Sequence, residues 1–541
     1  MIASPRGPPA RGGGYFWDVF RYRILQLQVP LKDKARPLPH LARAIGVPPR
    51  AVRSARPVRL SLDNRRERSV PRWVFQMEFE LDRPIPESGN VVAVPEGDAR
   101  PPLLESPGTL DLPERIHVVG AGPAGLWAAW TLARRGYRVT LHERGKAVEE
   151  RYRDIRRFVK ERELDPESNA LFGEGGAGFY SDGKLTSRTR NEFTAQVLRD
   201  LADLGAPEEV QWLAKAHLGT DRLQLYLKEL RSRLLALGAE IRFGSRVEEI
   251  DVRAGRVRAI RANGVEIPAE CVVLAAGHSA RDVYRMLDRV GVALEPKGFA
   301  VGIRAEHPQS LIDRRHFGPG ADLSLTGPAE YVLKAPASRG GAYSFCMCPG
   351  GVLVPCSTAR GQLATNGMSY SGRSGKFANA GIVVPVDLTA EGLFAGLEFQ
   401  EELERRAFEM GGSDCGAPAQ SVAAFVAGRA DRGPLPESTW PTGLVPSRLS
   451  ELFGPRLTEA LASSLVSFDR AIPGFVDRGL AVGPETRTSS PLRVLRDPET
   501  LRAAGTEGLY PLGEGAGYSG GIVSSAADGV RLGVLAKRRT A

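Results

Sequence analysis

The sequence predicts an α/β protein: a Rossmann-type sheet, an inserted antiparallel α+β domain and a small α+β module ahead of both. Two stretches of the sequence predict strands of the Rossmann-type sheet. Residues 115–145 predict a strand, a glycine-rich turn, a helix and a second strand, and residues 271–277 predict a buried strand ending at a glycine. A third stretch, residues 508–537, predicts a strand followed by a helix. We expect the strand at 271–277 to return to the first sheet.

The turn Gly120–Gly125, GAGPAG, has the spacing of a dinucleotide-binding turn. In such turns the first glycine permits the sharp bend, the second lets the backbone approach a pyrophosphate, and the third lets helix and strand pack closely. The helix expected from about Pro123 to Arg135 would direct N–H groups and a partial positive charge at the phosphates. Glu143, at the end of the second strand, is placed to accept hydrogen bonds from an adenosine ribose. These features together favour dinucleotide binding over a purely structural turn.

Two later segments predict further cofactor contacts. The glycines of residues 173–184 are too dense for a helix or strand interior and favour a backbone lying flat against a planar ligand, with Asp182 and Lys184 at the rim. The alternative is a surface loop. In residues 508–522 the acid Glu514 would bind a ribityl hydroxyl, and the helix starting near Gly521 would stabilise negative charge on a flavin.

The residues expected to bind the cofactor are Gly120, Gly122, Ala124, Gly125, Glu143, Arg144, Gly175, Gly176, Gly178, Ser181, Asp182, Gly183, Lys184, Val247, Ala276, Gly277, Gly513, Glu514, Gly520, Gly521 and Ile522.

The composition argues against a membrane-spanning, secreted or nucleic-acid-binding protein. The 541 residues are 42% hydrophobic and 25% charged, as in an ordinary globular protein. No apolar run approaches the roughly 20 residues that span a bilayer, and the first residues carry no secretory signal. Five cysteines do not suggest a disulfide framework, so we expect a reducing, cytoplasmic location. The net charge of +10 comes from scattered arginines without aromatic clustering, so we expect no nucleic-acid partner.

Composition and periodicity also predict the domain organisation. Residues 20–82 contain three alternating strands and one helix, which suits a ferredoxin-like module; without an obvious chemical residue, its expected role is to dock a protein partner. The predicted parts are a disordered tail (1–19), this N-terminal module (20–82), a Pro- and Gly-rich linker (83–113), a cofactor-binding domain (114–285 and 486–541) and an inserted substrate domain with long alternating strands (286–485).

Six motifs carry a resemblance to a known family. They are FGEGGAG with SDGKL (172–185), EHPQ (306–309), FCMCPGG (345–351), TNGMS (365–369), ETRTSSP (485–491) and GEGAGYSGGI (513–522). They resemble an uncharacterised family of NAD(P)/FAD-dependent oxidoreductases, FAD-dependent dehydrogenase-like proteins with an N-terminal α+β module. The resemblance implies FAD, an inserted substrate-type domain and no settled substrate. This chain departs from the pattern with Phe179-Tyr180 in the glycine loop and Gly-Glu, not Gly-Asp, at 513–514.

The features together predict a glutathione-reductase-like FAD protein that transfers a hydride at the flavin to or from a small or hydrophobic substrate. The one complete dinucleotide turn would hold FAD, so NAD(P)H would bind transiently, or another electron donor serves. The alternatives are a flavin-dependent oxidase or monooxygenase, and a flavin-containing scaffold or sensor whose N-terminal module binds a partner.

Three residues are candidates for catalysis. In an extended strand Cys346 and Cys348 face the same side, so both thiols would face the flavin as a redox pair; the alternative is two small buried side chains. His278, directly after Gly277, is a candidate proton donor or a packed side chain. No spacing of Cys and His predicts a metal site. Arg487 and Lys184 are candidates for binding an anionic substrate.

Overall fold

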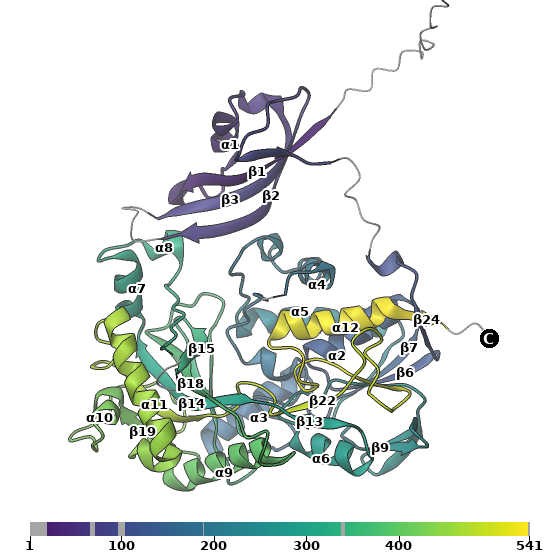
Figure 1. The fold of residues 1–541 in the computed structure, drawn as a ribbon, viewed down its shortest axis with the longest axis vertical. Helices are drawn as coiled ribbons and strands as arrows, with labels where there is room; N and C mark the ends of the chain where they lie inside the picture. The colour runs from purple at the N-terminus through teal and green to yellow at the C-terminus, as the bar shows by residue number, and fades with distance from the viewer. Residues whose placement is uncertain (1–18, 65–70, 96–102, 188, 337–340, 539–541) are drawn as a thin grey trace, which may run out of the picture. The chain divides into compact units, whose positions relative to one another are not determined.

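The computed structural model describes residues 19–64, 71–95, 103–187, 189–336 and 341–538 (Figure 1). The chain forms two compact units, one of residues up to 100 with 212–214, and one of residues 101–211 and 215–541. All but the last residue of the predicted disordered tail lies outside the described residues.

The first unit is a four-stranded antiparallel sheet with one helix. Its elements are β1 (Phe20–Pro30), α1 (Leu38–Ala44), β2 (Val52–Asp63), β3 (Arg72–Leu81) and β4 (Val91–Ala93), in the strand order β2-β3-β1-β4. Alternate residues of β3, from Trp73 to Leu81, are buried, because successive side chains of a strand point to opposite faces.

The predicted linker 83–113 is not free of structure. It contains β4, which pairs with β1, and β5 (Leu110–Leu112), which pairs with β24 (Ala536–Arg538) at the end of the second unit. The linker prediction is wrong for these two segments, because three-residue strands are too short to show alternation among prolines and glycines.

The second unit contains a five-stranded parallel sheet in the order β23-β12-β6-β7-β8. Its strands are β6 (Arg115–Val119), β7 (Arg138–His142), β8 (Glu240–Arg242), β12 (Val272–Leu274) and β23 (Leu509–Pro511). Helices α2 (Pro123–Arg134) and α12 (Ile522–Leu535) pack together beside it (Figure 1). The predicted Rossmann-type sheet is therefore confirmed, including the return of β12 to the side of β6.

Further elements surround this sheet. They are α3 (Val148–Glu161), α4 (Glu192–Asp203), α5 (Thr220–Ala236), α6 (Arg281–Arg289) and a three-stranded sheet of β9 (Val247–Arg253), β10 (Arg256–Ala262) and β11 (Val265–Pro268).

The residues between α6 and β23 build a second, six-stranded sheet in the order β15-β18-β14-β21-β19-β20. Its strands are β14 (Phe299–Pro308), β15 (Tyr343–Cys348), β18 (Phe377–Val386), β19 (Ala417–Ser421), β20 (Leu444–Pro446) and β21 (Leu480–Glu485). All pairs are antiparallel except β19 with β20. The accompanying helices are α7 (Gln309–Phe317), α9 (Ala395–Met410), α10 (Val422–Val426) and α11 (Leu449–Ala471). Two strand pairs also accompany the sheet, β13 (Leu294–Pro296) with β22 (Leu492–Val494), and β16 (Val352–Pro355) with β17 (Thr365–Met368).

The sequence predicted strands in which buried and exposed residues alternate, but the central strands of this sheet do not alternate. Nearly every residue of β14 and the first eight of β18 are buried. Since neighbouring residues of a strand point to opposite faces, both faces of the sheet must be covered. Helix α11 packs against both strands, and the β16–β17 pair (Val352–Pro355 and Thr365–Met368) contacts them as well.

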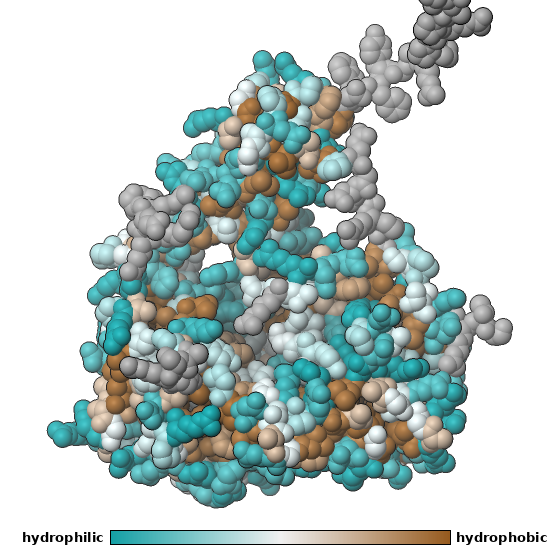
Figure 2. All heavy atoms as spheres, viewed as in Figure 1, coloured by the Kyte–Doolittle hydropathy of each residue, from teal (hydrophilic) through white to brown (hydrophobic). Residues whose placement is uncertain are grey.

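In the described part of the chain, no helix is both long and apolar enough to cross a bilayer. The view in Figure 2 shows hydrophobic residues interspersed with hydrophilic ones on each unit.

A buried ionic cluster joins the end of the Rossmann sheet to the inserted segment. Glu404 on α9 accepts from Arg281 on α6 (2.8 and 2.9 Å) and from Arg487 (2.8 and 3.0 Å), and all three side chains are almost fully buried. Burial alone would raise the pKa of Glu404, but the two arginines outweigh it and lower the pKa to about 2.

This cluster predicts a pH-dependent part of the stability. Glu404→Gln leaves two buried guanidinium groups without their carboxylate, which should cost about 3–5 kcal/mol in the free energy of unfolding at neutral pH. Because the pKa of Glu404 falls from 4.5 to about 2 on folding, its contribution is full above pH 4.5 and is lost as the pH falls toward 2. Urea unfolding across this range should show a larger loss of stability in the wild type than in Glu404→Gln, because other carboxylates with lowered pKa values titrate in both proteins.

The matched control is Glu402→Gln on the same helix, whose partner Arg405 is exposed. It should leave unfolding nearly unchanged. Equal effects of the two substitutions would contradict the structural role of the buried cluster.

Candidate functional site

A pocket of about 260 Å³ opens at the carboxyl ends of the parallel strands. Its walls come from Val119 and Gly120 after β6, from residues 142–144 after β7, from residues 275–280 after β12, and from Leu512 and Glu514 after β23. In open α/β sheets this edge is where ligands bind, because the loops there diverge.

The turn after β6 is shaped by three glycines with different tasks. Gly120 has φ +103° and donates its N–H to the His142 carbonyl (2.8 Å). A Cβ on Gly125 would lie 1.9 Å from the Gly120 carbonyl oxygen, so helix α2 can approach the strand only with glycine there. A Cβ on Gly122 would meet only Gly176 Cα, at 3.9 Å. The protein thus leaves free the space beside Gly122 that a pyrophosphate would fill.

Glu143 is buried and ties the turn to a distant segment. Its Oε2 accepts from the Ala121 N–H (2.7 Å), and its Oε1 accepts from Gly145 (2.8 Å) and Gly173 (3.0 Å). The carboxylate also lines the pocket. Besides the predicted contact with a ribose, which stays a prediction, Glu143 therefore fixes the turn against the glycine-rich segment, a role that the sequence did not indicate.

The glycine-rich segment 173–184 is an ordered wall, not a surface loop. The buried guanidinium of Arg151 donates to the carbonyls of Asn169, Glu174 and Gly176 at 2.7–2.9 Å. A Cβ on Gly176 would lie 3.0 Å from Gly122 Cα, and one on Gly178 would lie 2.9 Å from Ile522 Cγ1. These glycines serve close packing of protein against protein, so substituting them disturbs the fold whatever the pocket holds.

Asp182 and Lys184, predicted as polar groups at the rim, differ in how deeply they are buried. Asp182 is fully buried and accepts from Arg373 Nε (2.9 Å). Lys184 donates from Nζ to the Met347 carbonyl oxygen of β15 and lies 3.6 Å from Asp182. Both residues line the pocket while joining the glycine-rich segment to the inserted sheet.

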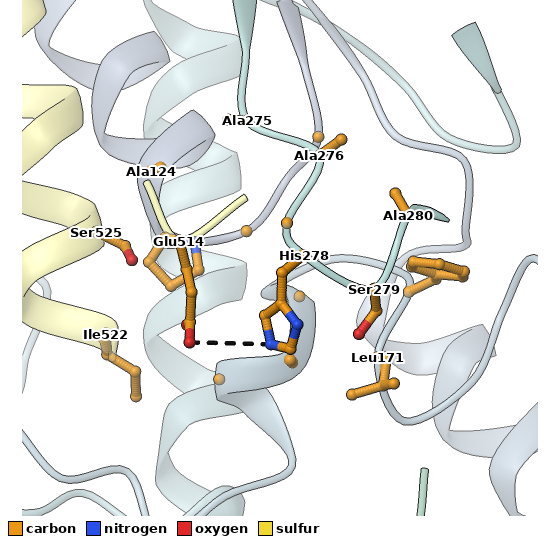
Figure 3. A pocket seen from close by; sticks show the side chains of 18 of the residues that line it. Ala124, Leu171, Ala275, Ala276, His278, Ser279, Ala280, Glu514, Ile522 and Ser525 are labelled. Atoms are coloured by element: carbon orange, nitrogen blue, oxygen red, sulfur yellow. Dashed lines mark ion pairs between the residues drawn. The ribbon is translucent and has the colours of Figure 1, made fainter. Parts of the chain in front are cut away.

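His278 and Glu514 face each other in the pocket, with Nε2 and Oε1 3.8 Å apart (Figure 3). Burial, with the nearby charges of Arg487 and Arg281, lowers the pKa of His278 to about 3, so the imidazole is neutral at neutral pH. Burial raises the pKa of Glu514 to about 7, against the opposing effects of the Gly521 N–H and Lys297. Near neutral pH Glu514 can therefore gain or lose a proton, whereas His278 stays neutral.

The sequence predicted that both cysteines of β15 face the pocket, but only Cys346 lines it. Pairing of β15 with β18 shifts between Phe345 and Cys348, and Cys346 has φ +45°. This bulge breaks the regular alternation, so that Cys346 lines the pocket while Cys348 is fully buried behind it.

Most of the residues predicted from sequence come together in this pocket. Of the predicted residues, those that line it are Gly120, Gly122, Ala124, Glu143, Arg144, Gly176, Gly178, Ser181, Asp182, Gly183, Lys184, Val247, Ala276, Gly277, His278, Cys346, Arg487, Glu514, Gly521 and Ile522. Gly125, Gly175, Cys348, Gly513 and Gly520 do not.

Sequence reasoning missed several lining residues, among them Leu171, Ser279, Phe345, Asn366 and Thr488. Phe345 and Asn366 lie inside the FCMCPGG and TNGMS motifs, so these motifs could have indicated that both residues belong to the site.

Arg487, a candidate for binding an anionic substrate, is already paired with Glu404. In the described ranges no group of three or more His, Cys, Asp and Glu side chains is arranged to hold a metal ion.

Three family models match the chain. Residues 118–162 match an NAD(P)-binding Rossmann-like domain, residues 164–337 an FAD dependent oxidoreductase, and residues 298–488 an FAD-dependent protein, C-terminal domain-like.

Solved structures give a weaker likeness. The chain is similar to L-amino acid deaminase from Proteus vulgaris (12% identity, 80% of this chain and 96% of that chain, TM-score 0.34) and to glycine oxidase from Bacillus cereus ATCC 14579 (11%, 77% and 93%, TM-score 0.32). Because these TM-scores are below 0.5, the assignment rests on sequence.

An uncharacterised protein from Clostridium beijerinckii is 41% identical over 434 residues, which cover 79% of this chain and 81% of that protein. The chain therefore belongs to the same family as this protein, a family of FAD-dependent oxidoreductases.

Proposed function

We propose that the protein transfers a hydride between FAD, held in the pocket at the carboxyl edge of the parallel sheet, and a small or hydrophobic substrate. The observation that carries the proposal is the free space beside Gly122, at the start of α2 and in a pocket that continues to the inserted sheet. Bound FAD would supply an isoalloxazine ring that accepts or donates a hydride. Its arrangement in a glutathione-reductase-like manner is part of the proposal.

Different residues of the chain would bind different parts of FAD and the substrate. The start of α2 presents N–H groups and a partial positive charge to the pyrophosphate, and Glu143 retains lone pairs for a ribose. Glu514 would bind a ribityl hydroxyl and hold a proton near neutral pH. The substrate would enter beside Phe345, Cys346 and Asn366, the lining residues that the inserted segment contributes.

The proposal also covers a protein partner, the cellular location and the electron donor. The N-terminal unit is proposed to dock a protein partner. A reducing, cytoplasmic location is proposed because five cysteines, an odd number in a long chain, do not suggest a disulfide framework. NAD(P)H is proposed as a transient electron donor.

The first test is direct. Purified protein should carry non-covalent FAD that heat denaturation releases as a yellow chromophore, and anaerobic NAD(P)H should bleach its visible absorbance. A protein that stays colourless after FAD is added would contradict the proposal. Reduction only by a substrate with rapid oxygen consumption would instead identify an oxidase, and full FAD binding without turnover would favour a scaffold or sensor.

The second test uses the free space beside Gly122. Gly122 has φ −77°, which any residue adopts, so Gly122→Ala should fold normally. Its methyl group would occupy the position expected for the pyrophosphate and should weaken FAD binding by about tenfold or more. Fluorescence titration of apoprotein with FAD measures this, with the melting temperature of the apoprotein as a check on folding.

Two glycines provide the comparison. Gly433→Ala, at an exposed position with no neighbour within 4 Å, should change neither FAD affinity nor melting temperature. Gly125→Ala should destabilise the apoprotein itself, because its methyl group collides with the Gly120 carbonyl. Unchanged FAD affinity in Gly122→Ala would rule out this site for the pyrophosphate.

A further inference from the structure

Cys346 is held in a strained conformation at the wall of the pocket. Its φ of +45° lies in the left-handed region, which is unfavourable for a non-glycine residue. Two cations from other elements hold the bulge in place: Arg304 Nη2 donates to the Cys346 carbonyl oxygen (2.8 Å), and Lys184 Nζ donates to the next carbonyl, that of Met347. The strain is thus maintained by specific contacts.

The bulge brings the two thiols of β15 together. In a regular strand, residues i and i+2 lie nearly 7 Å apart, at or beyond the upper limit for a disulfide. Here the Cys348 thiol donates to the Cys346 carbonyl oxygen (3.3 Å) and accepts from Arg304 Nη2 (3.3 Å), and the two thiols lie close enough that each shifts the pKa of the other. The bulge thus departs from the regular i, i+2 geometry that would strain a disulfide between these positions.

The surroundings of the two sulfurs differ. The neighbouring Cys348 side chain, with help from Arg304 and Lys184 against burial, lowers the pKa of the Cys346 thiol. The neighbouring Cys346 side chain and burial raise the pKa of the Cys348 thiol well above its usual value. The cysteine that lines the pocket thus has the lower pKa and the buried one the higher, as in a pair of an attacking and a resolving cysteine.

We propose that Cys346 and Cys348 form a thiol–disulfide couple that exchanges two electrons with FAD in the adjoining pocket. On oxidation one bond forms, between the two Sγ atoms; the S–H bond of Cys348 breaks and releases its proton to solvent, and FAD as the acceptor would take up the two electrons and one proton. Reduction reverses each step. The inference rests on the proposed function only for its electron acceptor.

The first experiment needs no substitution and no activity. Native holoprotein is oxidised with diamide, remaining thiols are alkylated after denaturation, and a chymotryptic peptide that contains Cys346 and Cys348 but not Cys356 is weighed. We expect this peptide to lose two hydrogens and to escape alkylation at both cysteines, and dithiothreitol to restore both. Full alkylation of both cysteines after diamide would overturn the proposal.

The second experiment counts electrons. In an anaerobic dithionite titration, oxidised wild-type protein should take up about two two-electron equivalents per bound FAD, one for the flavin and one for the disulfide. Cys346→Ser and Cys348→Ser should each take up about one, and Cys415→Ser, a partly exposed thiol whose pKa is raised, should take up two like the wild type. One equivalent in the wild type would contradict the couple.

The pH dependence of alkylation separates a redox role from packing. Cys346 in native protein should react with iodoacetamide with a midpoint below the usual range of a free thiol, and Cys348→Ser should shift that midpoint upward because it removes the thiol partner. A midpoint above pH 8 in the wild type would overturn the assignment of Cys346 as the thiolate. A protein without FAD would defeat the proposed function, whereas the diamide and alkylation results would still decide the state of the cysteines.

Discussion

The structure depends on the close approach of helix α2 to strand β6. Gly125 allows the helix to rest on the Gly120 carbonyl, where any Cβ would collide at 1.9 Å. Helix α12 approaches α2 in the same way, since a Cβ on Gly529 would lie 2.3 Å from the Ala124 carbonyl oxygen. These two contacts place the start of α2 and the connection that carries Glu514 at one edge of the sheet. The pocket exists because these contacts hold its walls at that spacing.

The remaining walls are attached mainly through buried polar contacts. Glu143 links the turn to the glycine-rich segment, Asp182 links that segment to Arg373, and Glu404 links Arg281 to Arg487. Buried charges are costly unless paired, so each contact permits one arrangement and penalises others. The inserted segment is therefore fixed against the Rossmann sheet by partners of opposite charge. The strained bulge of β15 is held differently, by Arg304 and Lys184 donating to its backbone carbonyl oxygens.

Local patterns in the sequence predicted the parallel sheet, helix α2 and most of the pocket, because apolar runs and glycine spacing report directly on strands and tight turns. They failed where tertiary partners decide. Asp182 looked like a rim residue because its partner Arg373 lies 191 positions later. The cysteines looked like a regular i, i+2 pair because nothing local indicates a positive φ at Cys346. Strand β14 was expected to alternate, yet it is covered on both faces by elements distant in sequence.

The most direct test of the account is a crystal structure of the protein with FAD bound. We expect the pyrophosphate at Gly122 and the start of α2, and the isoalloxazine ring within about 5 Å of both the backbone of residues 173–184 and the Cys346 sulfur. An FAD bound elsewhere, or an isoalloxazine ring beyond contact of both the glycine-rich segment and Cys346, would contradict the central claim that this glycine-shaped edge is the redox site.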